Sequence, residues 1–388
     1  MLCIFHPRIH APGDLRRLNA LVVFLFVLRG VRLAFAAVQE DALAENRLAQ
    51  RLPASRSAAD NALSSPNEEI FEAIWRKDRR RVEELLAQGV PVDVRNADQW
   101  TPLMAAALAG WPEMVRFLLE RGADVNTVDK SGHSALAHGI RYKEVVQILL
   151  ERGANPNVPS VQGYPLLIEK IVRERDEEIA KLLVNGGANV NIQEPLFGLT
   201  PLIGAVKYAS DDMILVLLEK GASVKARDKE GNTALILAAR HRSRSTIEAL
   251  LAQGAEINAS NKRGETALMR AAEGNNEVLR LLLQKGAHLE ASRENGWTPL
   301  ICAAAAPSTA GVDILLEAGA NVNARSKTGQ TALMFAAIRG NVDMLEMLLF
   351  RGADVNVKDI YGNTALKNAK RSASRHAVAL LRAAGAKE

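Results

Sequence analysis

WTPLMAAALAGWPEMVRFLLERGADVN, residues 100–126, carries the pattern that decides the fold. Near its end stand two leucines, two further residues, a glycine and an alanine. This ending returns ten times along the 388 residues, with small variations, at intervals of 31 to 35 residues. The leucine pairs begin at Leu85, Leu118, Leu149, Leu182, Leu217, Leu250, Leu282, Leu315, Leu348 and Leu380. Such a constant period predicts stacked supersecondary units rather than one globular core.

Each unit is predicted to contain two helices. Thr101 and Pro102 suit the N-cap and the first position of a helix, because threonine accepts a hydrogen bond from an orphan N–H and proline lacks that N–H. Leu103, with alanines three and four residues later, fits one helical face. Gly122 follows the leucine pair, where a left-handed residue commonly ends a helix. The short polar stretch after it predicts a hairpin.

The stretches at residues 100–126 and 330–356 closely resemble the ankyrin repeat. The resemblance covers residues 66–388 and implies an all-α fold, an ankyrin-repeat solenoid of helix-turn-helix units with short projecting β-hairpins. It implies about ten repeats, with modified caps at residues 66–98 and 364–388. The family commonly has a histidine after Thr-Pro-Leu. Here this slot is mostly apolar, as at Met104 in the first stretch, so we expect more apolar packing between repeats.

Two local features refine this expectation. Ser65, Pro66 and Glu68 stand in capping-box order and predict the start of the first helix. The units that begin at Ser134 and Tyr164 have irregular first helices in their sequence pattern. We therefore expect a local bend or weaker stacking between residues 134 and 188.

Residues 1–65 do not share the repeat. A basic flank, an apolar run at residues 18–28 and an Ala-Phe-Ala sequence that ends at Ala36 predict a bacterial-type secretory signal. We expect a signal peptide at residues 1–36, cleaved after Ala36, and a linker at residues 37–65. Cleavage would leave the mature chain in the periplasm or outside the cell.

A retained signal anchor in the inner membrane, with the repeats facing the periplasm, is the alternative. As a helix, the apolar run would span about 16 Å of a hydrocarbon core near 30 Å. A longer span would bring Arg29 and Arg32 into the membrane, so we favour cleavage. Arg16 and Arg17 leave both the general and the twin-arginine export routes open.

The charge of the mature chain argues against a nucleic-acid partner. The full sequence has 49 basic and 44 acidic residues, a net charge of +5. Residues 1–36 contain five arginines and one aspartate, so the remainder has 44 basic and 43 acidic residues and a net charge of +1. Little general attraction to phosphate remains. Cys3 leaves with the signal, so Cys302 stands alone and an intramolecular disulfide is excluded.

No pattern predicts catalytic, cofactor-binding or metal-binding residues. The histidines of the mature chain lack the helical pair, four residues apart, that binds zinc. They are His133, His138, His241, His288 and His376. Adjacent carboxylates such as Glu177 and Glu178 do not face each other on a helix. We therefore expect no enzyme. The competing hypothesis is an enzyme or enzyme regulator with its reactive residues in the irregular segment 139–178.

In ankyrin repeat proteins the first helices and the hairpins line a concave face that binds a partner protein. The resemblance thus implies a monomeric scaffold with a protein partner. The residues expected at this surface are Leu108, Leu237, Arg240, Arg242, Lys262, Arg263, Arg270, Phe335 and Arg339. The segment Arg240-His241-Arg242-Ser243-Arg244, with Lys262, Arg263 and Arg270 nearby, defines a central basic zone, which we predict to dock an acidic surface. The alternative is a solvated turn between helices.

The leading hypothesis is therefore an exported, non-enzymatic protein–protein interaction scaffold. Two alternatives stay open: a secreted effector that acts on a host protein, and a regulator or chaperone-like binder of a periplasmic enzyme. No membrane contact is expected unless the signal is retained as an anchor. The sequence does not name the partner.

Overall fold

The computed structural model describes residues 65–387. The chain divides into two compact units, Met1–Val90 and Pro91–Glu388. The predicted signal peptide and nearly all of the predicted linker lie outside the described residues. Across residues 65–387, no helix combines the length and the apolar character that a membrane span requires.

The described part of the first unit is a helix pair, α2 (Pro66–Trp75) and α3 (Arg79–Ala87). Each helix buries apolar residues, with Ile74 in α2 and Leu85 in α3 fully inaccessible. A charged contact also joins the two helices, because the Arg81 guanidinium donates from Nε and Nη2 to the two carboxylate oxygens of Glu69, at 2.8 and 2.9 Å. The pair is therefore held by both apolar packing and a two-point ion pair.

The capping box predicted at Ser65 is wrong. Ser65 does occupy the N-cap, with Pro66 in the first turn, but its hydroxyl makes no capping hydrogen bond. Its backbone carbonyl instead accepts from the Glu68 amide at 2.8 Å. The side chain that caps in this unit is Asp78, which accepts from the Arg81 amide at 3.0 Å and starts α3.

The second unit is a succession of helix pairs joined by hairpin loops. Its first helices are α4 (Pro102–Leu108), α6 (Ala135–Gly139), α8 (Leu166–Ile168) continued by the π-helix η2 (Glu169–Glu174), α10 (Pro201–Tyr208), α12 (Ala234–Ala238), α14 (Ala267–Ala272), α16 (Pro299–Ala305), α18 (Ala332–Arg339) and α20 (Ala365–Arg371). Its second helices are α5 (Pro112–Glu120), α7 (Lys143–Glu151), α9 (Glu177–Asn185), α11 (Asp211–Glu219), α13 (Arg244–Ala252), α15 (Asn276–Gln284), α17 (Ala310–Glu317), α19 (Val342–Phe350) and α21 (Arg375–Ala383).

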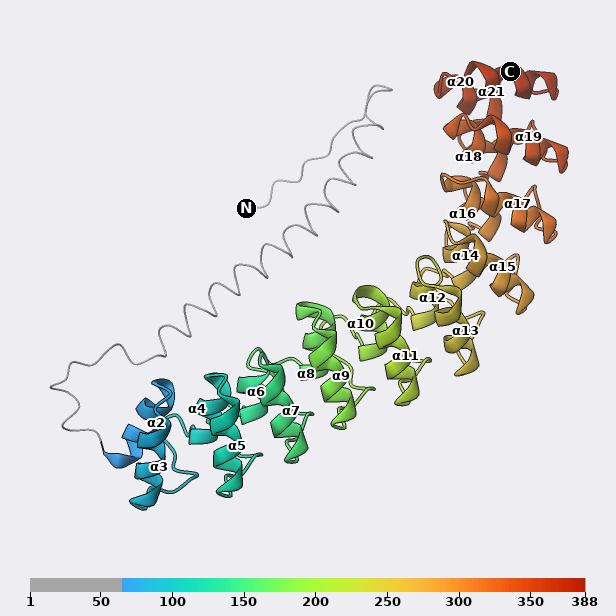
Figure 1. Ribbon diagram of the computed structural model, residues 1–388. Coiled ribbons are helices and arrows are strands. Elements are labelled where there is room, and N and C mark those ends of the chain that lie inside the picture. The colour runs from blue at the N-terminus through green and yellow to red at the C-terminus, as the bar shows by residue number, and fades with distance from the viewer. Residues whose placement is uncertain (1–64, 388) are drawn as a thin grey trace, which may run out of the picture. The chain divides into compact units, whose positions relative to one another are not determined.

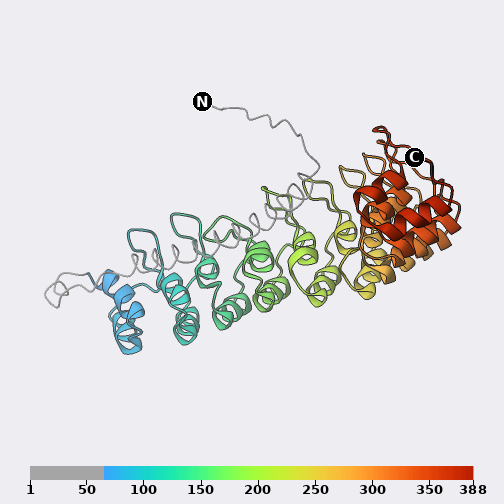
Figure 2. The same cartoon turned by 90° about the horizontal axis from the view of Figure 1, so that it is seen from above.

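Within this unit the pairs follow one another in a bent row, with the first helices on the inner side of the bend (Figure 1). Figure 2 shows that the hairpin loops project to one side of the helices. The predicted all-α solenoid is confirmed. The predicted β-hairpins form only isolated bridges among the described residues, at Val128–Ser134, Pro159–Pro165 and Ser260–Thr266.

Threonine caps start the first helices, as predicted. The Thr101 hydroxyl accepts from the Met104 amide at 3.3 Å, and equivalent bonds form at Ser134, Thr200, Thr233, Thr266, Thr298 and Thr364. Thr331 is an exception, because its hydroxyl is buried without a hydrogen-bond partner. Local sequence therefore predicts most, but not all, of the helix starts.

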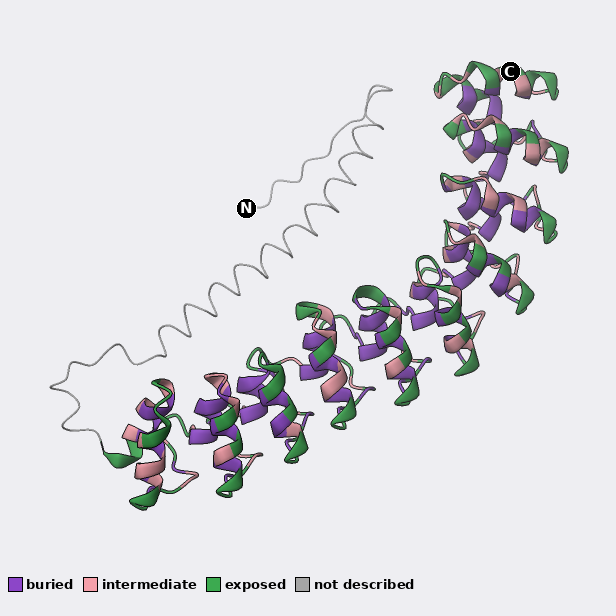
Figure 3. Ribbon diagram, in the orientation of Figure 1, coloured by how far each residue is buried: buried purple, intermediate pink, exposed green. Residues whose placement is uncertain are grey.

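The core lies between neighbouring helix pairs (Figure 3). In α4 every residue from Pro102 to Ala107 is buried, whereas α5 buries only one stripe. The slot that commonly holds histidine in the family is nearly inaccessible and apolar in most units, for example at Met104, Ile236, Met269 and Ile301. Each such side chain contributes about 1.5 to 3 kcal/mol on burial. The prediction of apolar packing at this slot is confirmed.

The unit that begins at Tyr164 is irregular, as predicted. Its first helix has only three α-helical residues, after which the chain continues as η2 and ends at Arg175 in the left-handed region. π-helical turns are rare and occur mostly as single turns within α-helices. The unit that begins at Ser134 is not distinguished in this way, because its five-residue helix α6 matches α12 in length.

Hydrogen bonds join most hairpin tips to the next. A tip amide donates to a carbonyl of the preceding tip, in the pairs Lys130–Asp98, Lys229–Phe197, Lys262–Glu230, Glu294–Arg263, Lys327–Asn295 and Ile360–Thr328, at 2.9 to 3.3 Å. Among the described residues no such bond joins the tip at residues 160–163 to its neighbours. The interruption coincides with the irregular unit.

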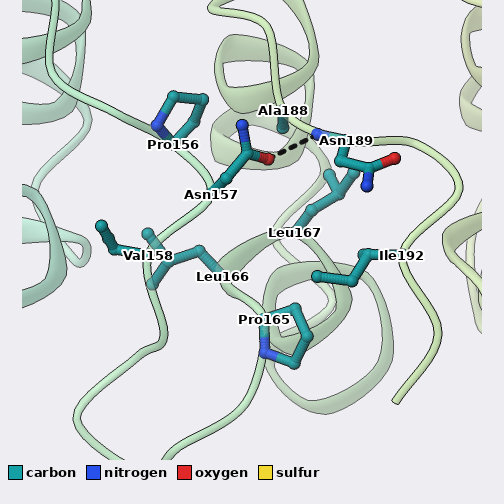
Figure 4. Close-up of a pocket in the computed structure, with 9 residues that line it drawn as sticks. All are labelled: Pro156, Asn157, Val158, Pro165, Leu166, Leu167, Ala188, Asn189 and Ile192. Carbon is teal, nitrogen blue, oxygen red and sulfur yellow. Dashed lines mark hydrogen bonds between the residues drawn. The ribbon is translucent and has the colours of Figure 1, made fainter.

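A recurring asparagine supplies a second link between repeats. The Asn323 side chain donates to the Gly352 carbonyl at 3.2 Å and accepts from the Asp354 amide at 2.8 Å. Asn126, Asn157, Asn191 and Asn356 bridge in the same way. Figure 4 shows the bond from the Asn189 amide to Asn157, beside a small pocket. Lys225 stands in the equivalent position and cannot accept.

Two substitutions test the contribution of this link. Asn323→Ala removes two hydrogen bonds between repeats and should lower the free energy of unfolding by about 1 kcal/mol. Lys225→Asn introduces a side chain that can both donate and accept hydrogen bonds. This variant should raise the free energy of unfolding by a similar amount. Urea unfolding measures both, with Lys220→Asn as the control. A stabilising Asn323→Ala variant would contradict the assignment.

Candidate functional site

The hairpin tips of the second unit expose apolar and basic side chains. Leu196 and Phe197 are 56% and 58% exposed, and Ile360 and Tyr361 are 65% and 71% exposed. Several basic residues are also exposed at the tips, namely Lys130, Lys229, Lys262, Arg263 and Lys327. We call these nine residues the tip row. Amide-to-carbonyl bonds link the backbones of the tips from Phe197 to Ile360.

The predicted apolar contacts are half-buried. Leu108, at the end of α4, and Leu237, in α12, both keep part of their side chains accessible. Phe335 in α18 packs edge-on against Trp297, with ring centroids 4.9 Å apart. The aromatic pair fixes Phe335 in place while leaving part of it accessible to a partner.

Arg242 is occupied by contacts within the repeat stack. Its guanidinium donates from Nε and Nη2 to the Val206 carbonyl at 2.9 and 2.6 Å, and from Nη1 to Asp211 at 3.0 Å. The Val206 carbonyl lies near the C-terminal end of α10, where carbonyls lack helical partners. Arg339 similarly donates to the Ala305 carbonyl at the end of α16. Both arginines therefore link adjacent repeats.

The predicted basic zone is largely neutralised by acidic side chains. Arg240 lies 2.9 Å from a Glu273 oxygen, and Arg270 lies 2.6 Å from a Glu265 oxygen. Arg293 also contacts both glutamates, Glu265 at 3.4 Å and Glu273 at 2.5 Å. Burial raises the pKa of Glu265, but the Asn261 hydrogen bond and the nearby arginines outweigh it and hold that pKa below its usual value. Both carboxylates therefore balance two of the three arginine charges.

Two predicted basic residues remain open to solvent. Lys262 and Arg263 are exposed at one hairpin tip, and neither forms a salt bridge within the described residues. Cys302, by contrast, is buried in α16, and burial raises the pKa of its thiol to about 12. Because the thiolate is the reactive form, this cysteine is a packing residue.

The irregular unit holds a buried charged cluster. Lys170 is fully inaccessible, with its Nζ atom 2.5 Å from a Glu174 oxygen. Glu169 is also buried, and burial together with the neighbouring Glu174 raises its pKa to about 7 although Ser160 and Lys170 act in the opposite direction. The pocket nearby has a volume of about 10 Å³ and is lined mainly by apolar residues. It accommodates no more than a water molecule.

A second polar cluster was missed by sequence reasoning. Asp129 lies at a hairpin tip, and its carboxylate accepts from the amides of Ser131 and His133 at 2.8 and 3.0 Å. The His138 ring, from α6, places Nε2 2.9 Å from Asp129 Oδ2, and His133 places Nδ1 3.7 Å from Oδ1. The histidines are five residues apart and belong to different elements, so a search for two histidines on one helix does not find them.

Glu169 should make stability depend on pH. Its pKa is raised from 4.5 to about 7 by folding, so the folded state holds a proton that the unfolded state releases. The contribution of Glu169 to the free energy of unfolding is fully present below about pH 4.5 and is lost as the pH rises through about 7. We expect a loss on the order of 1 to 3 kcal/mol for the wild type between pH 5 and 8.

Glu169→Gln should remove most of this loss, because glutamine stays neutral. The midpoint of urea unfolding at pH 5 and pH 8 measures the effect, and Glu144→Gln, on an exposed glutamate, is the control. If Glu169→Gln kept the full pH dependence of the wild type, the assignment would be wrong.

Relatives match parts of this chain. The mouse B-cell lymphoma 3 protein homolog is 36% identical over 148 residues, which cover 37% of this chain and 33% of that protein. The phosphocholine transferase AnkX of Legionella pneumophila is 30% identical over 39% of this chain and 13% of its own length. The human 2-5A-dependent ribonuclease is 42% identical over 19% of this chain and 10% of its own length. The chain thus spans between 10% and 33% of the length of these relatives.

A solved structure is also similar to this chain. The crystal structure of the ankyrin repeat domain of Bcl-3 is 35% identical, with a TM-score of 0.46, and the match covers 56% of this chain and 97% of that domain.

The family models match across most of the repeat array. The model described as Ankyrin repeats (3 copies) matches residues 70–160, 168–261 and 245–326, and the model described as Ankyrin repeats (many copies) matches residues 315–369. Together they cover more than half of the chain. Ankyrin repeats generally bind protein partners and are generally not catalytic. This chain belongs to the ankyrin repeat family.

Proposed function

We propose that this chain is an exported, non-enzymatic scaffold that binds a partner protein through the tip row and the inner ends of the first helices. The observation that carries the proposal is the tip row itself. Exposed large apolar side chains such as Phe197 and Tyr361 are held in register with exposed lysines and arginines. Aromatic and arginine side chains are the residue types that dominate binding at protein interfaces.

The structure narrows the set of residues that we propose as partner contacts. Lys262 and Arg263 are exposed and form no salt bridge within the described residues, so they are the strongest basic candidates. Leu108, Leu237 and Phe335 stay in the set as partly accessible neighbours. Arg240 and Arg339 stay because both are exposed, although Arg240 pairs with Glu273 and Arg339 donates to the Ala305 carbonyl. Arg242 leaves the set because its donors already bind Val206 and Asp211. Arg270 contributes little net charge beside Glu265.

The partner surface is proposed to be acidic and partly apolar. Electrostatic attraction between unlike patches mainly raises the association rate, whereas buried apolar contacts slow dissociation. A nucleic-acid partner is disfavoured, because acidic residues such as Glu230 and Glu294 are interleaved with the basic tips. The scaffold itself is proposed to be monomeric.

The export part of the proposal rests on the sequence of residues 1–36, with its basic flank, apolar run and Ala-Phe-Ala site. It places the partner in the periplasm or outside the producing cell. The buried position of Glu169 and Lys170 supports a structural role for the irregular unit rather than a reactive one.

Site-specific crosslinking in the producing cells tests the proposal. A photo-crosslinking amino acid at Lys262 should capture one protein reproducibly, and the captured species should fractionate with exported proteins. The same amino acid at Lys285, exposed at the end of α15, is the control and should not capture it. The purified partner should bind Lys262→Glu/Arg263→Glu about tenfold more weakly, a change of about 1.4 kcal/mol. Lys220→Glu/Lys285→Glu should bind like the wild type.

Three results would count against the proposal. Equal capture from Lys262 and Lys285 would exclude the tip row as the binding surface. Unchanged affinity of the double charge reversal would exclude a role for this basic tip. A chain that stays in the cytoplasm with residues 1–36 intact would exclude export. The binding surface would then still be tested separately by the crosslinks.

A further inference from the structure

Three potential metal ligands meet where one hairpin tip contacts its own first helix. They are the Asp129 carboxylate, the His133 imidazole and the His138 imidazole, and their ligand atoms all lie within 4.8 Å of one another. Asp129 and His138 side chains are 4% and 2% exposed, and that of His133 is 15% exposed. Of the five histidines between residues 65 and 387, two are thus gathered around one buried carboxylate.

The equivalent positions of two other tips show what the hairpin alone requires. In all three tips the aspartate amide donates to the carbonyl four residues later at 3.0 Å, in the pairs Asp129–His133, Asp228–Asn232 and Asp359–Asn363. Asn232 and Asn363 each donate a side-chain hydrogen bond to their aspartate. An asparagine at this position therefore supplies the side-chain hydrogen bond to the aspartate, and the turn does not require a histidine there.

The residue nine positions after the aspartate varies in the same comparison. It is His138 in the first of these tips, Leu237 in the second and Asn368 in the third. The fold accepts an apolar or an amide side chain at this position. Of these three tips, the one at residues 129–138 alone pairs two imidazoles with one carboxylate.

Two imidazole nitrogens and one carboxylate oxygen form a ligand set for borderline divalent ions. Zinc binds such atoms at about 2.0 to 2.2 Å, so neighbouring ligands of one ion lie roughly 3 to 4 Å apart. The distances of 2.9 Å from His138 Nε2 to Asp129 Oδ2 and 3.7 Å from His133 Nδ1 to Oδ1 are close to this range. Small side-chain rotations would bring the three atoms around one ion.

The surroundings also suit a metal site. Asp129 Oδ1 already accepts two backbone hydrogen bonds, which fix the carboxylate and turn Oδ2 toward His138. The Trp100 ring lies 4.3 Å from the His138 ring and covers it. Hydrogen bonds that orient a ligand, together with an apolar cover, are typical of metal sites in proteins.

We propose that Asp129, His133 and His138 bind one divalent transition-metal ion of the zinc class. Three protein ligands leave a fourth position for water or for a ligand from a partner. The ion would tie the hairpin at residues 128–134 to α6. This inference does not depend on the proposed function.

Cobalt titration of the full chain after chelator treatment is the direct test. Cobalt(II) with nitrogen and oxygen ligands absorbs visible light, and zinc should displace it. We expect one equivalent of cobalt per chain and a rise in the thermal midpoint with zinc. His133→Asn and His138→Asn, which copy residues found at the third tip, should each weaken cobalt binding at least about tenfold. His288→Asn, on an exposed outer loop, is the control and should bind like the wild type.

Circular dichroism separates a loss of metal binding from a loss of fold. Both asparagine variants should retain the wild-type spectrum. Binding that does not saturate at one equivalent, or that is unchanged in either His133→Asn or His138→Asn, would overturn the site.

Discussion

The hydrogen bonds that pass from one hairpin to the next set the register on which the rest of the second unit depends. A single helix pair has two apolar faces and cannot bury both, so apolar packing drives neighbours together without fixing their offset. The tip bonds, such as Lys262 to Glu230, and the asparagine bridges, such as Asn323 to Gly352, supply that offset. They also hold the backbones of the tips from Phe197 to Ile360 in one linked series.

The sequence predicts the helices well because their signals are local. Thr101 and Pro102 start a helix from their own chemistry. The bonds between repeats are harder to predict from the sequence. Arg242 looks like a surface cation in the sequence, because its partner, the Val206 carbonyl, lies 36 residues earlier in the chain. A signal for the asparagine bridge was present in the recurring Gly-Ala-x-x-Asn pattern. No pattern of spacing within one helix indicates the meeting of His133 and His138, which depends on the hairpin folding back onto α6.

The same long-range contacts change the picture of the candidate surface. A cluster of arginines around Arg240 predicts a strong positive patch, but Glu265 and Glu273 balance most of that charge. What remains is a row of tips with separate basic and apolar side chains. Such a surface suits a protein partner with mixed chemistry better than a polyanion. The family assignment and the surface therefore point to the same class of function.

Native-state hydrogen exchange of the tip amides tests the central claim most directly. If the tips are joined as described, the amides of Lys262 and Ile360 should exchange at least about tenfold more slowly than unbonded surface amides, although their side chains are exposed. Exchange of both amides at the rate of an unstructured peptide would contradict the account, because the hairpins would then not hold one another in register.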